Sequence, residues 1–229
     1  MIVLLFGAPG SGKGTQARFI SECRGIPAIS TGDMLRAECR AGTMLGNAAC
    51  AVLANGGLLE DATMNAIVAK RLQQPDCAAG FILDGYPRTI PQAVALTRFL
   101  EDSGIPEPVI VHLDVPDEVL VARLSSRRYC PGCGRTYNLL AQPPVQPGKC
   151  DGDDEALVQR SDDDAGVVGE RLKAYHKLTE PVIEYYQGPH CYRVNGGCTP
   201  EEISEQIEAV LTMDAAQDDC EPIACTKRR

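Results

Sequence analysis

Apolar and polar residues follow one another along this chain in blocks that predict strands and helices in turn. Short apolar runs at residues 2–6, 81–83 and 109–113 are typical of strands buried on both faces. Between them the apolar residues recur at helical spacing, as in Met64, Ile67, Val68 and Leu72. This alternation predicts parallel βα units and an α/β fold with helices on both faces of the sheet.

The same pattern gives the remaining elements. A strand is predicted at 191–194, and residues 26–30 form either a short strand or an extended link. Capping residues and apolar periodicity together place helices at 13–23, 34–36, 45–53, 61–72, 90–100, 116–124, 165–186 and 199–211.

Two segments interrupt the alternation and predict smaller domains. Residues 129–163 contain cysteines, a Pro-Pro pair and several glycines but no helical pattern, which indicates an inserted module. Residues 30–59 form a small helical excursion. The core domain then comprises residues 1–29, 60–128 and 164–213. We expect residues 214–229 to be poorly ordered, with Cys220 and Cys225 leaving a redox or metal role open.

The first strand leads into a glycine-rich stretch, Gly7-Ala8-Pro9-Gly10-Ser11-Gly12-Lys13-Gly14-Thr15, and then into a helix. Glycines permit positive φ, so that successive N–H groups point at an anion where the helix dipole adds positive potential. The spacing from Gly7 to Lys13 fits the phosphate-binding P-loop, except that the hydroxyl comes one residue late, at Thr15. A plain glycine-rich turn is the alternative, but the strand and helix on either side favour the P-loop.

A second strand, at 81–83, ends in a carboxylate and continues as Asp84-Gly85-Tyr86-Pro87-Arg88-Thr89. Ligands of open α/β sheets lie beyond the carboxyl ends of the strands. Asp84 is therefore expected near the phosphates bound by the P-loop.

Composition and charge narrow the possible functions. The net charge of -9 argues against a general nucleic-acid binder, and no apolar run approaches the length of a membrane span. The chain opens on a strand and P-loop rather than on a secretory signal, so we expect a cytoplasmic protein without membrane partners.

The chain has 11 cysteines, an odd number spread along its length, which is a poor framework for disulfides. In the reducing compartment expected for this protein, disulfides are also rare. Cys130, Cys133 and Cys150 have the spacing of a zinc ribbon in which Asp153 is the fourth ligand, although Asp151 and Asp154 are also candidates. Such a closed site is structural; the alternative is an empty, reduced thiol cluster. Most other cysteines are expected to behave as small hydrophobic residues, as for Cys23, Cys39, Cys50 and Cys77.

Three stretches together resemble the signatures of adenylate kinase: residues 7–15, Ser30-Thr31-Gly32-Asp33-Met34-Leu35-Arg36 and residues 84–89. The resemblance covers residues 1 to about 213 and includes the long form of the lid, which favours Asp153 as a zinc ligand. Tyr86 stands where phenylalanine is commoner. The resemblance implies a P-loop nucleotide kinase fold, in which a mostly parallel five-stranded sheet has helices on both faces. Residues 30–59 would be the domain that binds the monophosphate, and residues 129–163 the lid. It also implies the reaction ATP + AMP ⇌ 2 ADP with Mg²⁺, a structural Zn²⁺ and a monomer.

The resemblance also assigns roles to individual residues. The charged groups expected in catalysis are Lys13, Arg36, Arg88, Arg123, Arg127, Arg160, Arg171 and Asp84. Those expected to bind ATP are Gly10, Ser11, Gly12, Lys13, Gly14, Thr15, Arg123, Arg127, Thr136 and Tyr137. Those expected to bind AMP are Thr31, Arg36, Gly57, Leu58, Leu59, Gly85, Arg88, Gln92, Arg160 and Arg171. Asp84 and Asp33 are expected to orient waters on Mg²⁺.

The arginines fit this chemistry because phosphoryl transfer between two polyanions needs positive charge from several directions. Arg123 and Arg127 are expected one helical turn apart. Each arginine taken alone is as well explained as a surface residue paired with an acid.

Other functions stay open at this point. A kinase acting on UMP, CMP or GMP is the nearest alternative, against which Thr31, Gln92 and the long lid argue. A zinc-ribbon nucleic-acid-binding protein lacks support from a basic, aromatic-rich surface. A nucleotide sensor without activity would not need six clamp arginines.

Overall fold

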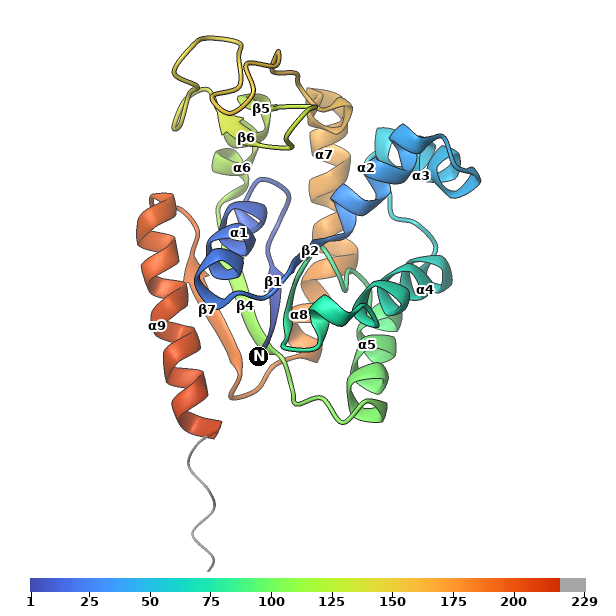
Figure 1. The fold of residues 1–229 in the computed structure, drawn as a ribbon. Helices are drawn as coiled ribbons and strands as arrows, with labels where there is room; N and C mark the ends of the chain where they lie inside the picture. Colours follow the sequence, from blue (N-terminus) through green and yellow to red (C-terminus); the bar gives the residue numbers. More distant parts are fainter. Residues whose placement is uncertain (219–229) are drawn as a thin grey trace, which may run out of the picture.

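The computed structural model describes residues 1–218, and at its centre lies a five-stranded parallel sheet (Figure 1). The strand order is β2-β3-β1-β4-β7, with every pair parallel. The strands are β1 (Ile2–Phe6), β2 (Ala28–Ser30), β3 (Phe81–Asp84), β4 (Val109–Asp114) and β7 (Cys191–Asn195). This confirms the predicted fold class. Because β1 pairs with β3, with Leu5 opposite Asp84, the loops that follow these two strands lie side by side.

Helices cover both faces of the sheet, as the alternation predicts (Figure 1). The helices around the sheet are α1 (Lys13–Arg24), α4 (Asp61–Leu72), α5 (Ile90–Asp102), α6 (Asp117–Ser125), α7 (Ala165–Ala174), α8 (Glu180–Tyr185) and α9 (Pro200–Asp218). Short 3₁₀ turns occur at η1 (Pro75–Cys77) and η2 (Ser161–Asp163). No helix among residues 1–218 is long and apolar enough to cross a membrane.

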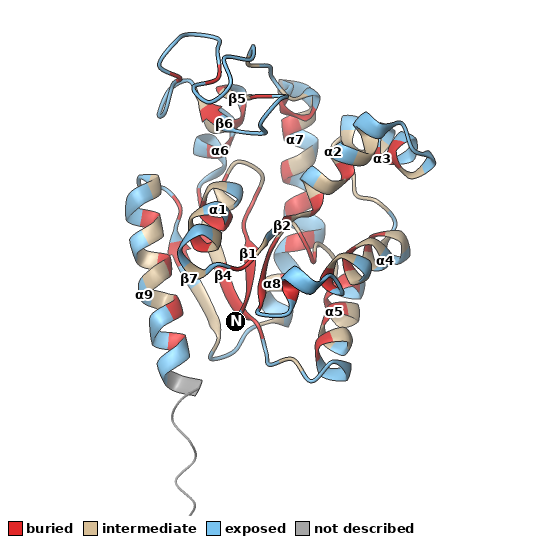
Figure 2. Cartoon of the chain, viewed as in Figure 1, coloured by how far each residue is buried: buried red, intermediate tan, exposed pale blue. Residues whose placement is uncertain are grey.

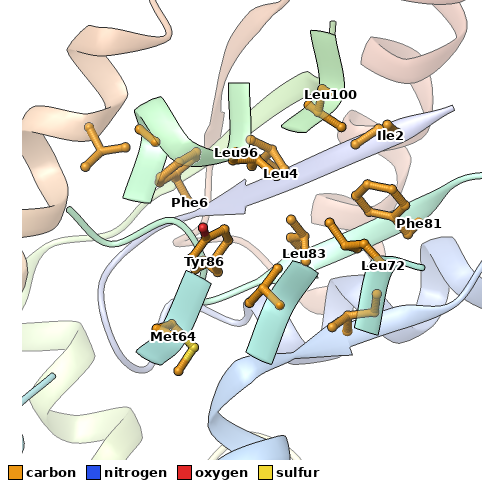
Figure 3. Close-up of a cluster of buried hydrophobic side chains, with 14 of the residues drawn as sticks. Ile2, Leu4, Phe6, Met64, Leu72, Phe81, Leu83, Tyr86, Leu96 and Leu100 are labelled. Atoms are coloured by element: carbon orange, nitrogen blue, oxygen red, sulfur yellow. The ribbon is translucent and has the colours of Figure 1, made fainter. Parts of the chain in front are cut away.

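Side chains of β1 alternate between two hydrophobic clusters, one on each face of the sheet. Leu4 and Phe6 pack with side chains of α4, α5 and α8 in the cluster of Figure 3. Val3 and Leu5 pack on the other face, against α1 and α9. Figure 2 shows the resulting buried centre. A strand buried on both faces needs no polar alternation, which is why β1 reads as a continuous apolar run.

The prediction of a single helix at 165–186 is wrong in one respect. It is divided into α7 and α8 by a π-helical turn, η3 (Tyr175–Thr179). The Thr179 hydroxyl in this turn donates to the carbonyl oxygen of Arg88 at 3.0 Å. The irregular turn thus connects the helix to the loop that follows β3, and π-turns are common at functional sites.

Residues 30–59 contain two helices, α2 (Thr31–Ala41) and α3 (Met44–Ala54), beside the carboxyl edge of the sheet (Figure 1). A disulfide joins Cys39 to Cys50, so the prediction that these two are merely small hydrophobic residues is wrong. Cys77 is buried in the core as predicted, whereas Cys23 is exposed.

The predicted insert contains no α-helix. A two-stranded antiparallel sheet of β5 (Arg127–Tyr129) and β6 (Thr136–Asn138) spans its predicted start at residue 129. Most residues of the insert are exposed (Figure 2). Helix α6 ends at Ser125, so Arg127 belongs to a strand. The prediction that Arg123 and Arg127 lie one helical turn apart is therefore wrong.

The last helix is longer than predicted. Helix α9 continues to Asp218, and Asp214 is buried, accepting hydrogen bonds from the Tyr192 hydroxyl and pairing with His190. Residues 214–218 are thus part of the fold rather than of an irregular tail. The rest of the predicted tail, with Cys220 and Cys225, lies outside the described residues.

Candidate active site

The P-loop joins β1 to α1 as its sequence predicts. Gly10 and Gly12 adopt φ of 88° and 101°, and Gly12 caps the helix that begins at Lys13. A side chain at either position would be strained, so the loop needs glycine there. The Lys13 ammonium group folds back over the loop, donating to the carbonyl oxygens of Gly7 at 2.7 Å and Ala8 at 2.9 Å. The loop thus presents a helix N-terminus and an ammonium group at one place, as phosphate binding requires.

A cavity of about 1110 Å³ opens above the P-loop. Most of the predicted nucleotide-binding residues line it, with Asp84 and all seven predicted basic groups. Those that line it are Gly10, Ser11, Gly12, Lys13, Gly14, Thr15, Arg36, Gly57, Leu58, Asp84, Gly85, Arg88, Arg123, Arg127, Thr136, Tyr137, Arg160 and Arg171. Thr31, Leu59 and Gln92 are not among the lining residues. The volume lies just above the usual range for a ligand pocket.

Hydrogen bonds of its Nε and of its backbone hold Arg88 in the loop after β3. Its Nε donates to the carbonyl oxygen of Gly85 at 2.7 Å, and its backbone N–H donates to Oε1 of Gln92 at 2.8 Å. The other end of the Gln92 amide donates to Asp61 at 2.7 Å. The buried Gln92 side chain is therefore engaged in positioning this loop.

Two residues support this loop in ways that the sequence did not reveal. Asp61, the first residue of α4, accepts hydrogen bonds from Gln92 and from the Thr89 hydroxyl at 2.8 Å. Thr31 is buried, and its hydroxyl donates to the carbonyl oxygen of Gly85 at 2.8 Å. Hydrogen bonds from both sides thus hold the backbone that carries Gly85 and Arg88.

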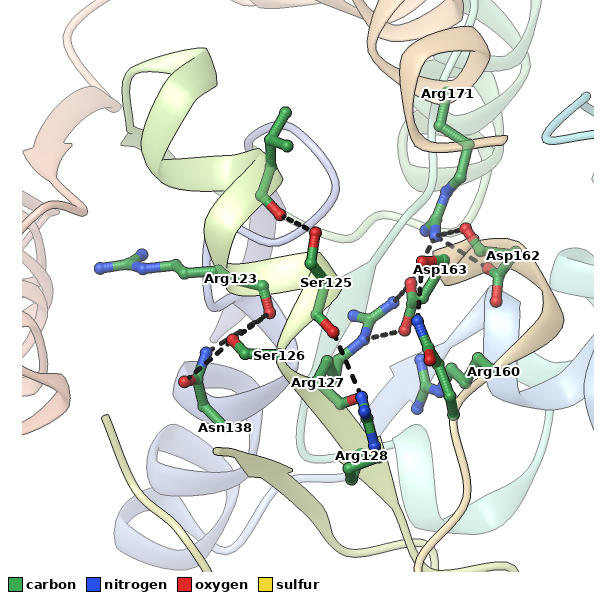
Figure 4. Close-up of polar contacts among 12 residues, drawn as sticks. Arg123, Ser125, Ser126, Arg127, Arg128, Asn138, Arg160, Asp162, Asp163 and Arg171 are labelled. Carbon is green, nitrogen blue, oxygen red and sulfur yellow. Dashed lines mark hydrogen bonds and ion pairs between the residues drawn. The ribbon is translucent and has the colours of Figure 1, made fainter. Parts of the chain in front are cut away.

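Two aspartates at the end of the insert hold two of the arginines (Figure 4). Nε of Arg127 donates to Asp163 at 2.7 Å, and Arg171 contacts Asp163 at 3.1 Å and Asp162 at 3.0 Å. The Asp163 side chain is fully buried, and these partners offset the free-energy cost of burying its polar oxygens. The sequence showed these acids only as part of an acid-rich run; an Asp-Asp pair that follows the predicted clamp residue Arg160 is the signal that could have identified them.

On the other side of the cavity, Asp33 lies between Arg36 and Arg160. Nη2 of Arg36 contacts the Asp33 carboxylate at 2.6 Å, and Arg160 lies 3.8 Å from the same oxygen. The Arg160 guanidinium also lies over the Tyr129 ring, while its buried Nε has no hydrogen-bond partner among residues 1–218. Burial lowers the pKa of Arg160 to about 10, with the nearby positive charges of Arg36 and Arg127 as further causes.

Arg123 points away from the other clamp residues in Figure 4. Its Nη1 donates to the carbonyl oxygen of Gly196 at 2.8 Å, in the loop between β7 and α9. Arg123 lines the cavity, but it approaches from the side of that loop rather than from the arginine and aspartate cluster.

Burial and nearby positive charges lower the pKa of Lys13. Burial lowers its pKa to about 8, Asp84 opposes the change, and the guanidinium groups of Arg88, Arg171 and Arg127 add to it. Phosphate binding favours the charged ammonium form. Since that form is lost as pH rises through about 8, we expect the affinity for Mg²⁺-free ATP to fall about tenfold between pH 7 and pH 9.

Equilibrium titration of ATP at constant ionic strength over this pH range measures the effect. The Lys13→Arg variant is the control, because guanidinium stays charged throughout and its affinity is expected to remain level. An equal fall in the variant and in the native protein would assign the effect to another group.

The insert brings four potential metal ligands together. The ligand atoms of Cys130, Cys133, Cys150 and Asp153 all lie within 4.8 Å of one another. Asp153 contacts the Cys130 sulfur at 3.2 Å, and the Cys133 and Cys150 sulfurs are 3.4 Å apart. Of the two other aspartates considered, Asp151 accepts instead from the backbone N–H of Val145.

Tyr137 has a second contact that the sequence did not suggest. Its buried hydroxyl donates to the Cys150 sulfur at 3.4 Å and accepts from the Asp151 backbone N–H at 2.8 Å. Residues outside a metal's ligand set commonly orient its ligands in this way. Tyr137 thus belongs to the surroundings of the cysteine cluster as well as to the wall of the nucleotide cavity.

Lys13 and the P-loop amides make one end of the cavity suited to a polyphosphate, and Arg88 with Arg36 offers a second place for an anion. A P-loop facing a second anion site, at the carboxyl edge of a parallel sheet, is the arrangement of a P-loop nucleotide kinase. The model of the adenylate kinase family matches residues 5–190. An adenylate kinase of Trichlorobacter lovleyi is 48% identical over 212 residues, which cover 92% of this chain and 99% of that protein. The chain belongs to the adenylate kinase family and is a phosphotransferase that acts on nucleotides.

Proposed function

We propose that this enzyme transfers the terminal phosphoryl group of ATP to AMP, giving two ADP, and runs equally in reverse. The observation that carries the proposal is the convergence of Lys13 and six arginines from separate elements on one cavity between the P-loop and the Arg88 loop. One phosphoanhydride replaces another in this reaction, so neither direction is strongly favoured. The monomeric state and cytoplasmic location expected from the sequence stay predictions.

ATP is proposed to bind at the P-loop end. The amides of residues 10–15 and the Lys13 ammonium group would hold its phosphates, because they face the cavity at a helix N-terminus. Arg123 and Arg127 approach this end from α6 and β5, and Thr136 and Tyr137 from β6.

AMP is proposed to bind at the end defined by the Arg88 loop and α2. Arg88 and Arg36 would hold its phosphate, and Gly57, Leu58 and Gly85 lie at the cavity wall where the nucleoside would contact them. Thr31, Leu59 and Gln92 remain predicted AMP contacts. The first and last of these already hold the Gly85 and Arg88 backbone, so they support the site whether or not they touch the base.

Catalysis would consist of positioning and electrostatics. No side chain need act as a strong base, because phosphoryl transfer between anions is limited by alignment and charge. Asp162 and Asp163 hold Arg127 and Arg171 in place before the nucleotides arrive, which reduces the reorganisation that the reaction requires. Arg160 and Arg171 would contact both the acceptor and the group in transfer. Closure of residues 30–59 and 129–163 would exclude water from the phosphates.

Magnesium fits the donor end of this site. The Asp84 carboxylate lies at the end of β3, where a Cβ on Gly14 of the P-loop would lie 3.4 Å from its Oδ2. Asp33 also lines the cavity, although it pairs with Arg36 in this structure. These carboxylates would hold waters of Mg²⁺, which when bound neutralises charge on the ATP phosphates.

The cysteine cluster of the lid fits Zn²⁺ in a structural role. Three sulfurs and one carboxylate make a closed ligand set with no open position for catalysis. Backbone N–H groups of Cys133 and Gly152 point at the Cys130 and Cys150 sulfurs at 3.4 Å, as suits thiolates. The lid has few buried apolar residues, so we propose that zinc supplies the cross-link that folds it.

Removing the metal is expected to destabilise the lid far more than the core. Limited proteolysis, with cleavage sites mapped by mass spectrometry, should show cuts within residues 129–163 soon after treatment with a strong chelator, while the core resists. Zinc added back should restore protection. Equal protection of the lid with and without metal would contradict a structural zinc.

The acceptor is tested by comparing rates with AMP, UMP, CMP and GMP at equal concentration in a coupled assay of ADP formation. AMP is expected to react fastest. Faster turnover with any of the other three would contradict AMP as the preferred acceptor. It would not contradict the P-loop or membership of the family.

A further inference from the structure

Cys39 and Cys50 are brought together by the close packing of α2 against α3. Their Cα atoms lie 5.6 Å apart, within the range for a disulfide, and the two sulfurs are bonded. A Cβ on Gly46 would lie 2.0 Å from the Glu38 carbonyl oxygen, so the helix backbones touch directly beside this pair. Thr43 in the connecting turn caps α3 and contacts Glu38 at 2.7 Å, which fixes the angle between the helices.

Dissolved thiols and disulfides can reach the Cys39–Cys50 pair. Cys50 is exposed and Cys39 is partly exposed, whereas a structural disulfide is commonly shielded. An exposed disulfide in a small helical domain is reached by dissolved thiols, and the corresponding dithiol is reached by dissolved disulfides.

The bond joins the two segments that bring the proposed AMP site together. Arg36 lies on α2, one turn before Cys39, and Gly57 and Leu58 follow α3 at the cavity wall. Cys39 and Cys50 are themselves outside the residues that line the cavity. A link between the helices at this point therefore joins the two segments of the proposed acceptor site but lies outside the cavity itself.

We propose that Cys39 and Cys50 form a reversible redox site that controls the affinity for the acceptor nucleotide; this rests on the proposed function. In the oxidising direction the Cys50 thiolate attacks a low-molecular-weight disulfide such as glutathione disulfide, releasing one glutathione as thiolate. Cys39 then displaces the second glutathione, and the protein disulfide forms. Two electrons pass to glutathione disulfide, and the two thiol protons leave with the glutathione products. Reduction by glutathione reverses each step.

The disulfide favours AMP binding because it removes freedom from the domain that must close. With the bond in place α2 and α3 move as one body, and less conformational entropy is lost on closure. Reduction is therefore expected to raise the KM for AMP roughly three- to tenfold and to leave the KM for ATP within about twofold.

The test uses the full chain equilibrated in glutathione buffers of graded redox potential. Free thiols are alkylated and the Cys39–Cys50 peptide is quantified by mass spectrometry, and both KM values are measured on the same samples. Cys50→Ser is expected to show the high AMP KM in every buffer. Cys23→Ser, which removes an exposed thiol on α1, is expected to respond as the native protein does.

Three outcomes would overturn the inference: both thiols alkylated in every buffer, an AMP KM that does not follow the bonded fraction, or a Cys50→Ser variant that still responds. Failure of the proposed function is distinguishable, because it would abolish AMP-dependent turnover in all samples. Hydrogen exchange over residues 31–59 decides the redox site even then: slower exchange in the oxidised protein supports it, and equal exchange contradicts it.

Discussion

Replacing Arg88 by alanine is expected to lower AMP-dependent phosphoryl transfer by about a thousandfold or more. The guanidinium lines the cavity beside the loop that follows β3, and its Nε donates to the carbonyl oxygen of Gly85. Gln92 and Thr179 hold the backbone of Arg88. Burial lowers the pKa of Arg88, so its charge is poorly solvated until an anion arrives. The pre-positioned charge should stabilise the acceptor phosphate and the group in transfer more than water could.

Kinetics with saturating ATP and varied AMP measure this effect. Arg88→Lys is expected to fall between the native protein and Arg88→Ala, because lysine keeps the charge but not the planar pair of donors. Arg98→Ala, at an exposed position on α5, is the matched control and should leave the rate unchanged. A rate within a few fold of native in Arg88→Ala would remove Arg88 from the acceptor site.

Replacing Lys13 by methionine is expected to lower kcat/KM for ATP by about a thousandfold, with the fold intact. Methionine keeps the length and apolar stem of the side chain but has no charge for the phosphates. The lysine also donates to the Gly7 and Ala8 carbonyl oxygens, so some change in the shape of the P-loop is expected to contribute.

Direct ATP binding and steady-state kinetics separate these contributions. Lys70→Met, on the exposed side of α4, controls for loss of a positive charge from the molecule. Circular dichroism and thermal unfolding should match the native protein. Native-like turnover in Lys13→Met would contradict the role of this lysine at the donor phosphates.

The sheet and the P-loop were predictable because they depend on the burial and backbone conformation of residues that are neighbours in the sequence. β1, β3 and β4 are buried on both faces and so appear as apolar runs, and Gly10 and Gly12 are required by backbone angles that other residues avoid. Parallel strands then place the P-loop and Asp84 at one edge without any further information.

The side-chain partners were not predictable, because they connect residues far apart in the chain. Nothing in the sequence pairs Arg127 with Asp163 or Gln92 with Asp61, and surface acids are common in a chain of this charge. The disulfide depends on the crossing of α2 and α3, which Gly46 permits but the cysteine spacing does not reveal.

The predicted helix boundaries are wrong where contacts between distant parts of the chain determine them. The periodicity of residues 165–186 is continuous, yet the π-turn allows Thr179 to reach Arg88. Helical spacing also predicted that Arg123 and Arg127 lie on one face of a helix. In the structure Arg127 lies outside α6, in strand β5, which pairs with β6. In both places a tertiary contact outweighs the local pattern.

The central claim, phosphoryl exchange between ATP and AMP, is tested most directly by following both directions to equilibrium with ³¹P NMR. One sample starts from ATP, AMP and Mg²⁺, and the other from ADP and Mg²⁺ with the same totals. Both are expected to reach the same mixture, with all three nucleotides present in comparable amounts and no inorganic phosphate released. Release of phosphate without ADP exchange, or unchanged nucleotides in a sample that binds ATP, would contradict the account.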